Sequence, residues 1–123
     1  MKRLFKLLTA AVAGLLLVSV LTACAPTQQL DMSKVASVID VRTPEEFATG
    51  HLEGALNIDF EGGDFETQIQ ALDHGANYVL YCRSGNRAGQ VLQYMQENGF
   101  TGTITNAGAV ADASAATGIK IVQ

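Results

Sequence analysis

The segment with the clearest capacity for chemistry in this 123-residue chain reads Cys-Arg-Ser-Gly-Asn-Arg and runs from Cys82 to Arg87. A thiolate is a strong nucleophile, and guanidinium groups beside it stabilise that anion or bind an anionic substrate. Glycine adopts positive φ angles and lets backbone amides approach a ligand closely. These residue types predict a nucleophilic thiolate on Cys82 within an anion-binding loop. The candidate binding residues are Arg83, Ser84, Gly85, Asn86 and Arg87.

The elements on both sides of this loop are expected to hold it at the edge of a sheet. Residues 78–81 form a continuous apolar strand, and a helix is predicted over 86–98 with Gly99 beyond its end. In open parallel sheets, ligand sites gather at the carboxyl ends of strands, and the amides at a helix N-terminus stabilise anions. The loop is therefore predicted to combine a nucleophile, backbone donors and positive charge. The apolar face of the predicted helix carries Ala88, Val91, Leu92 and Met95.

The remaining residues alternate short apolar runs with amphipathic stretches, which is typical of an α/β domain with a central, mostly parallel sheet flanked by helices. Further strands are predicted at 35–41, 55–58, 103–105 and 119–122. Thr43, Pro44 and Glu46 form the pattern of a capping box at the start of a short helix. Asp64 is placed to cap another helix. The alanine-rich stretch before the last strand has no clear assignment.

The N-terminus has the layout of a secretory signal peptide. Basic residues precede an apolar run over 7–21, which is short for a membrane span of about 20 residues. The sequence Leu-Thr-Ala-Cys at 21–24 resembles the lipobox of bacterial lipoproteins, in which the cysteine is acylated and begins the mature chain. An ordinary signal peptide or an uncleaved anchor is the alternative, and all three send the domain out of the cytoplasm.

This layout divides the chain into a lipoprotein signal peptide (1–23), a lipid-anchored tether (24–33) and one domain (34–123). We expect the domain to be extracytoplasmic and attached to the cell envelope through a lipid on Cys24. In a Gram-negative cell this places it on the periplasmic side. A domain of about 100 residues can bury one core without disulfides.

Acylation of Cys24 leaves Cys82 as the one free thiol, and a lone exported thiol is a candidate for chemistry. The alternative is an inert, buried cysteine that packs as a small apolar residue. From Cys24 onward, five lysine and arginine residues are set against twelve aspartate and glutamate residues, which disfavours nucleic acid as a partner. Arg83 and Arg87, two of the five cations, lie close to Cys82 in the sequence. The two histidines are scattered, so no metal site is predicted.

Three segments resemble the signatures of single-domain rhodaneses. Residues 81–88 are similar to the family's active-site loop, residues 38–47 to its first signature and residues 50–58 to its second, in the same order and spacing. The resemblance covers roughly residues 36–106. It implies the rhodanese-like fold, in which three layers are formed by a central, mostly parallel sheet between helices.

The resemblance also implies a sulfurtransferase that needs no metal or organic cofactor. In such an enzyme Cys82 takes the outer sulfur of thiosulfate or a related donor, becomes a persulfide and releases sulfite. Cyanide or a thiol then accepts the sulfur. Where family members often carry Asn-x-Gly-Gly and then a tryptophan, this chain has Ala109 and Ala113. These two alanines are expected to alter the rim of the pocket, so the resemblance does not define the sulfur acceptor or the rate of transfer.

Two other function classes remain as alternatives. A persulfide carrier or partner-binding module at the membrane surface, without turnover, is the main one because of the altered rim. Phosphatases and arsenate reductases of the same fold carry Cys-x5-Arg, one residue longer than the spacing from Cys82 to Arg87, and rank lower. Structural roles in caps, ion pairs or polar networks are the preferred interpretation for other polar residues near the motifs: Asp40, Arg42, Glu46 and His51.

Overall fold

The structure is a computed structural model that describes residues 29–123. The predicted signal peptide (1–23), the predicted lipidation residue Cys24 and the first part of the predicted tether lie outside the described residues. In chain order the elements are the 3-10 helix η1 (Met32–Lys34), β1 (Val35–Asp40), α2 (Pro44–Ala48), β2 (His51–Leu52), β3 (Leu56–Asn57), α3 (Phe65–Gln70), β4 (Asn77–Tyr81), α4 (Asn86–Glu97), β5 (Ile104–Asn106), α5 (Val110–Thr117) and β6 (Ile121–Val122).

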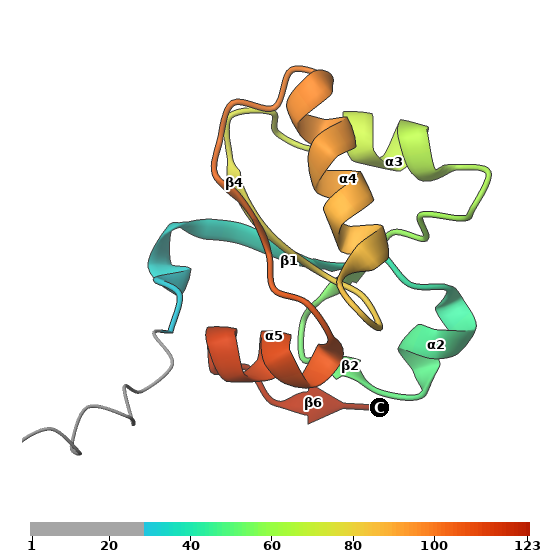
Figure 1. The fold of residues 1–123 in the computed structure, drawn as a ribbon, viewed down its shortest axis with the longest axis vertical. Helices are drawn as coiled ribbons and strands as arrows, with labels where there is room; N and C mark the ends of the chain where they lie inside the picture. Colours follow the sequence, from blue (N-terminus) through green and yellow to red (C-terminus); the bar gives the residue numbers. More distant parts are fainter. Residues whose placement is uncertain (1–28) are drawn as a thin grey trace, which may run out of the picture.

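Four strands form the central sheet in the order β3-β1-β4-β5, and every neighbouring pair is parallel. β1 and β4 lie in the middle, where Ile39 is opposite Leu80. Because parallel strands end at the same edge, the segments that follow β1, β4 and β5 come together there. The predicted α/β fold with a mostly parallel sheet flanked by helices is confirmed (Figure 1).

Alternate residues of β4 face two different cores. Leu80, and Cys82 two residues further on, lie in a cluster with residues of α3 and α4. Val79 and Tyr81 lie in a second cluster with Ala113 of α5. Since successive side chains of a strand point to opposite faces, this alternation produces the layers on both sides of the sheet. The predicted core face of α4 is confirmed for Ala88, Val91 and Met95, while Leu92 is only partly buried.

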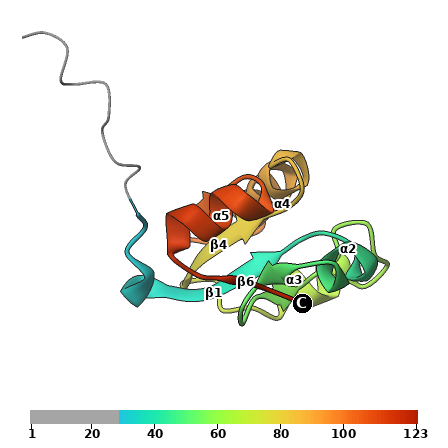
Figure 2. The ribbon, with the colours of Figure 1, turned by 90° about the horizontal axis from the view of Figure 1, so that it is seen from below.

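A small second sheet lies outside the central one. β2 and β6 pair in antiparallel fashion, with His51 opposite Val122 and Leu52 opposite Ile121. Both ribbon views show β6 next to α5 (Figures 1 and 2). The strand predicted at 119–122 is therefore formed only over its last two residues. Its apolar pattern indicates a strand but carries no information about which strand it will pair with.

The helices predicted to begin near Thr43 and Asp64 are both present, as α2 and α3. The predicted capping box of α2 is present, since Glu46 N donates to Thr43 Oγ1 at 3.3 Å and Thr43 N donates to Glu46 Oε1 at 3.5 Å. Asp64 occupies the N-cap position of α3, but its side chain makes no capping hydrogen bond, so that prediction is wrong. The unassigned alanine-rich stretch forms α5, which ends at Gly118 with a φ of 72°.

The described end of the predicted tether contacts the domain. Leu30 and Met32 pack against the second core cluster, and Leu30 N donates to Ala116 O at 2.8 Å. None of the helices within residues 29–123 has the length and apolar character that crossing a bilayer requires.

Candidate active site

Cys82 directly follows β4 and is fully buried at the carboxyl edge of the central sheet. Its neighbours in the core cluster include Ala88 and Val91 of α4. The sulfur nevertheless has a polar partner, because Gly85 N donates to Cys82 Sγ at 3.0 Å. The backbone N–H of Cys82 donates to Gly108 O, also at 3.0 Å. A backbone N–H directed at the sulfur stabilises a negative charge on it. A cysteine that is packed only against hydrocarbon has no such stabilisation.

Gly85 owes its place to its backbone conformation. It is the N-cap residue of α4 and has a φ of 91°, in the left-handed region where a side chain is strained. A Cβ atom at this position would lie 3.2 Å from the Cα of Gly108. This conformation turns the Gly85 amide back toward Cys82 and allows close contact with the segment after β5. The prediction that the loop needs a glycine here is therefore confirmed.

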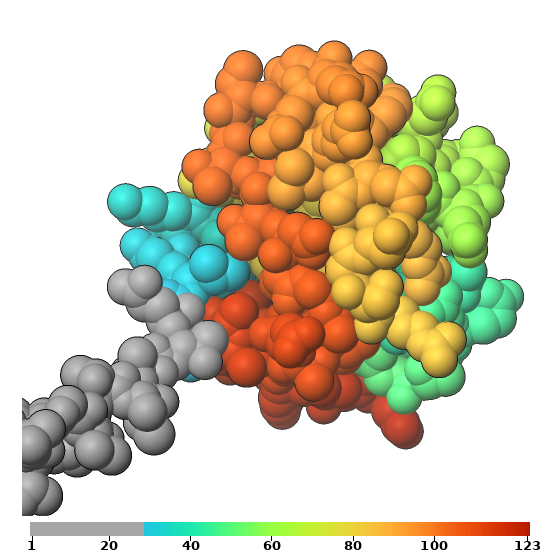
Figure 3. All heavy atoms as spheres, in the orientation of Figure 1, coloured from blue at the N-terminus to red at the C-terminus, as the bar shows by residue number. Residues whose placement is uncertain are grey.

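The segment after β5 braces the cysteine loop. Asn106 Nδ2 donates to Gly85 O at 2.9 Å, and Gly108 N donates to Asn106 Oδ1 at 2.9 Å. In the space-filling view, the yellow segment that follows β4 lies between the orange-red segment leading into α5 and the green segment of α2 (Figure 3). Sequence reasoning gave Asn106 no role, although the Asn-x-Gly pattern at 106–108 was visible as a signal.

Arg87, predicted to bind an oxyanion, is paired with a carboxylate from α2. Its Nη1 and Nη2 atoms donate to Glu46 Oε1 and Oε2 at 2.7 and 2.9 Å, and Glu61 Oε2 lies 4.0 Å from Nη1. The hydrogen bonds from Arg87 lower the pKa of Glu46 from 4.5 to about 2. Hydrogen bonding to Glu46 raises the pKa of Arg87. The positive charge of Arg87 is therefore balanced by Glu46.

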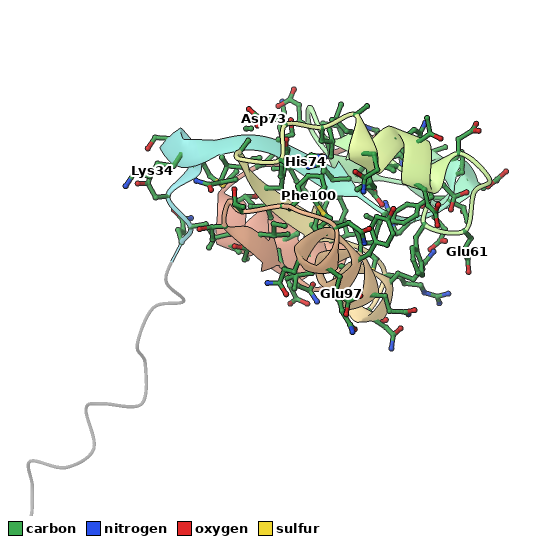
Figure 4. The ribbon with its side chains drawn as sticks, turned by 90° about the horizontal axis from the view of Figure 1, so that it is seen from above. Lys34, Glu61, Asp73, His74, Glu97 and Phe100 are labelled. Atoms are coloured by element: carbon green, nitrogen blue, oxygen red, sulfur yellow. The ribbon has the colours of Figure 1, made fainter. Side chains whose placement is uncertain are left out.

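Arg83 differs from Arg87 in its surroundings. It is exposed, and within residues 29–123 no carboxylate lies within 4.0 Å of its guanidinium. It lines a surface depression with Arg42, Glu45, Glu46 and Thr49. Lys34, another exposed cation, lies at the opposite end of the molecule from Glu61 (Figure 4). Among the described residues, Arg83 is thus the cation of the cysteine loop that has no carboxylate partner.

Ser84 and Asn86, the remaining predicted binding residues, are exposed and bonded locally. Ser84 Oγ accepts a long hydrogen bond of 3.4 Å from Asn86 N. Asn86 Oδ1 accepts a hydrogen bond of 2.7 Å from Gln90 Nε2 in the next turn of α4. Of the five predicted binding residues, Gly85 is the one whose hydrogen bond reaches the sulfur of Cys82 within the described part of the chain.

Asp40, the last residue of β1, forms a buried ion pair with Arg42. Arg42 Nη2 lies 2.6 Å from Asp40 Oδ2 and 2.7 Å from Gly50 O, and Arg42 Nε donates to Asp40 Oδ1 at 2.9 Å. Hydrogen bonding to Asp40 raises the pKa of Arg42. The phenol oxygen of Tyr81 accepts a hydrogen bond from Leu52 N at 3.0 Å, and burial raises the pKa of Tyr81. The structural roles predicted for Asp40 and Arg42 are confirmed.

The two histidines also have local roles. His51 stacks on Phe47 with ring centroids 3.6 Å apart, and its Nδ1 is hydrogen-bonded to Phe47 O at 2.9 Å. His74 stacks on Phe100, with ring centroids 4.1 Å apart. The two residues are labelled next to each other in Figure 4. Within residues 29–123, no three histidine, cysteine, aspartate or glutamate side chains gather as a metal site would require.

The alanines at 109 and 113, predicted to shape the rim of the pocket, take different positions. Ala113 is fully buried in the cluster on the α5 face of the sheet, which is not the cluster that contains Cys82. The turn after β5 directs α5 to that face, and the expected effect of the two alanines on the rim stays a prediction. Ala109 is the N-cap residue of α5, and its N–H donates to Asp112 Oδ2 at 3.3 Å.

Comparison with known proteins agrees with the sequence motifs. The sequence profile of the rhodanese-like domain matches residues 26–113. The chain is 36% identical over 73 residues to the putative sulfurtransferase YtwF of Bacillus subtilis, an alignment that covers 59% of this chain and 69% of that protein. It is 32% identical over 74 residues to the thiosulfate sulfurtransferase PspE of Escherichia coli, with coverages of 60% and 70%. A solved rhodanese with anions from E. coli superposes with a TM-score of 0.58 at 29% identity and covers 71% of this chain and 96% of that one.

Proposed function

Because this chain belongs to the rhodanese-like family and has sulfurtransferase relatives, we propose that it moves a sulfane sulfur from thiosulfate or a related donor to a thiophilic acceptor through a Cys82 persulfide. The single observation that carries this proposal is the contact of 3.0 Å between Gly85 N and Cys82 Sγ. A backbone donor fixed on the sulfur stabilises charge on the thiolate before transfer and on the persulfide after it.

The proposed reaction has two balanced displacement steps. In the first step the Cys82 thiolate attacks the outer sulfur of thiosulfate, a new sulfur–sulfur bond forms, and sulfite leaves with the electron pair of the broken bond. In the second step an acceptor thiolate or cyanide attacks the outer sulfur of the persulfide, and Cys82 leaves as a thiolate. Neither step needs a redox partner or a cofactor.

The charges around the loop support an anionic donor. Arg87 is balanced by Glu46, whereas Arg83 is exposed and has no carboxylate partner among the described residues. We therefore assign the main electrostatic attraction for the donor to Arg83. Ser84, Gly85 and Asn86 complete the binding loop through their polar groups and backbone amides, and Arg87 contributes through its position near Cys82.

The second candidate function is a persulfide carrier or partner-binding module without turnover of its own. The observation in its favour is the burial of Cys82, whose exposed fraction is 0%. A small molecule must displace part of the loop to reach the sulfur, whereas a protein partner can open the loop as it docks. Turnover with small substrates separates these two functions.

A sulfite-release assay tests the enzyme proposal. The full chain should release sulfite from thiosulfate in the presence of cyanide, and C82S should abolish release while unfolding at nearly the same temperature. The buried side chain changes only from sulfur to oxygen, so circular dichroism should show the same fold. A wild-type chain that is folded but inactive would favour the carrier, and activity retained in C82S would refute the assignment. Phosphate release from a phosphoester would instead support the phosphatase alternative.

We further propose that the chain is a lipoprotein whose Cys24 is acylated outside the cytoplasm. The support is the sequence alone: basic residues, an apolar run over 7–21 and the Leu-Thr-Ala-Cys motif. Expressed in a bacterium, the wild-type chain should incorporate labelled palmitate and sediment with membranes. The C24S variant should lose the label. Equal labelling of the two chains would contradict this proposal.

A further inference from the structure

The side chain of Asn106 bridges two backbone segments that both act on Cys82. Its amide nitrogen Nδ2 donates to Gly85 O at 2.9 Å, and its oxygen Oδ1 accepts from Gly108 N at 2.9 Å. Gly85 supplies the amide that contacts Cys82 Sγ, and Gly108 O accepts the N–H of Cys82. One side chain thus holds both partners of the candidate nucleophile.

We propose that Asn106 is a positioning residue that keeps the Gly85 amide directed at Cys82. The proposal rests on the proposed function in one respect only: the sulfur so positioned is the one that carries the sulfane sulfur. Nothing in the geometry requires Asn106 to contact a substrate.

Gly85 needs an external constraint to hold its orientation. Glycine visits positive and negative φ with similar ease, so a φ of 91° is not maintained by the residue itself. Two donors hold its carbonyl oxygen: Asn106 Nδ2 at 2.9 Å from outside the helix and Gly89 N at 3.0 Å from inside it. The bond from Asn106 is the one that links Gly85 to the neighbouring strand.

The strand order places Asn106 where it can do this. It is the last residue of β5 and lies opposite Leu80 of β4 in the parallel register, two residues before Cys82. From this position its side chain reaches across the end of β4 to the first residues of the loop. Asn106 is exposed, so its substitution opens no cavity in the core.

The chemistry of an amide side chain matches these two contacts. Asparagine donates and accepts at once, whereas an ionised aspartate only accepts. In N106D the contact with Gly108 N is retained, but a carboxylate oxygen faces Gly85 O and repels it. The same substitution also adds negative charge beside a sulfur that must carry negative charge. N106A removes both hydrogen bonds without adding charge.

Asn98 provides a matched control. It lies at the other end of α4, is exposed, and also donates from Nδ2 to a backbone carbonyl, that of Tyr94, at 2.7 Å. N98D makes the same chemical change as N106D, but far along the helix from Cys82.

The test measures the rate at which iodoacetamide alkylates Cys82 in the full chain carrying C24S, which leaves one thiol. Loss of one or two hydrogen bonds predicts a rate about 5-fold lower in N106A and about 10-fold or more lower in N106D, with N98D unchanged. If Asn106 only stabilised the fold, a looser loop would expose the buried thiol and raise the rate. A rate in folded N106A and N106D that equals or exceeds that of the parent chain therefore overturns the proposal.

Sulfur transfer provides a second, separate measurement. If the wild-type chain is active, kcat should fall in the uncharged variant N106A while the KM for thiosulfate stays within about 2-fold, because Asn106 does not bind the donor. A rise in KM at constant kcat overturns the positioning role. If the wild-type chain is inactive, the proposed function fails, and the alkylation rates alone still decide the role of Asn106.

Discussion

The carboxyl ends of β1 and β4 are neighbours at one edge of the sheet, where Val41 N donates to Tyr81 O at 3.1 Å. The charged side chains at these two ends differ in burial and pairing. After β1, Asp40 and Arg42 are buried and pair with each other. After β4, the sulfur of Cys82 accepts a single amide hydrogen bond and Arg83 remains exposed without a carboxylate partner among the described residues.

This difference separates a structural site from a site suited to chemistry. The ion pair at the end of β1 is held by hydrogen bonds between its own members, to Gly50 O and from the Arg42 backbone, so its two charges balance each other. The loop after β4 keeps a glycine with a φ of 91° and a cation without a carboxylate partner among residues 29–123 close to a nucleophile. Changes after β1 should therefore affect stability, and changes after β4 should affect reactivity.

The largest effect is expected from D40N. Removing one partner of a buried ion pair leaves Arg42 uncompensated and costs about 3–5 kcal/mol of unfolding free energy. Urea denaturation followed by circular dichroism measures this loss. D64N is the control, because Asp64 is exposed and its side chain makes no capping bond. Equal stability of D40N and D64N would show that the pair after β1 is not structural.

G85A tests the strained position after β4. A side chain at a φ of 91° and 3.2 Å from Gly108 Cα should cost about 1–3 kcal/mol and turn the amide away from Cys82. The rate of sulfite release should fall by a larger factor than the loss of folded protein at the assay temperature explains. G63A is the control, since a Cβ atom at Gly63 meets nothing within 4 Å. A G85A variant that releases sulfite at the wild-type rate would break the proposed link between the glycine and the sulfur.

R83A tests the free cation of the loop. Loss of one charge-assisted contact predicts a KM for thiosulfate about 5- to 10-fold higher, with kcat nearly unchanged and a weaker dependence of KM on salt. K34A is the matched control, because Lys34 is also an exposed cation and lies at the opposite end of the molecule from Glu61 (Figure 4). An equal response of R83A and K34A would mean that overall charge, and not Arg83, attracts the donor.

The smallest effect is expected for the pair between Glu46 and Arg87. Pairing lowers the pKa of Glu46 from 4.5 to about 2, so this pair stabilises the fold fully above pH 4.5 and loses its effect as the pH falls toward 2. Since both side chains are partly exposed, E46Q should cost only about 1 kcal/mol at pH 7. At pH 3 the loss of unfolding free energy caused by E46Q should be smaller than at pH 7. Urea denaturation at both pH values tests this, with E45Q as control, and a cost independent of pH contradicts it.

Local sequence signals predicted the parts of the fold that depend on neighbours in the chain. The capping box of Thr43 and Glu46 and the strand–loop–helix unit around Cys82 were both read from short segments and are both present. The family motifs added the arrangement of the sheet, and the rhodanese-like fold is confirmed. The helix α5 was missed because its alanine-rich sequence has no strong amphipathic pattern.

Long-range contacts explain what the sequence could not show about the site. Arg87 meets Glu46 across 41 positions, and Asn106 reaches Gly85 across 21. No local spacing encodes either contact, because both depend on the order β3-β1-β4-β5 that brings α2 and the end of β5 to opposite sides of the loop. The burial of Cys82 is likewise a result of packing by α4, which sequence alone does not specify.

If the proposed reaction occurs, Cys82 must carry the transferred sulfur, and intact mass spectrometry can detect that sulfur on the chain. The full chain carrying C24S is incubated with thiosulfate and measured without reductant. The predicted result is that the intact chain gains the mass of one sulfur atom and loses it again when cyanide is added, whereas the C24S/C82S chain gains none. A chain that keeps its original mass, or a C24S/C82S chain that gains sulfur equally, would contradict the account.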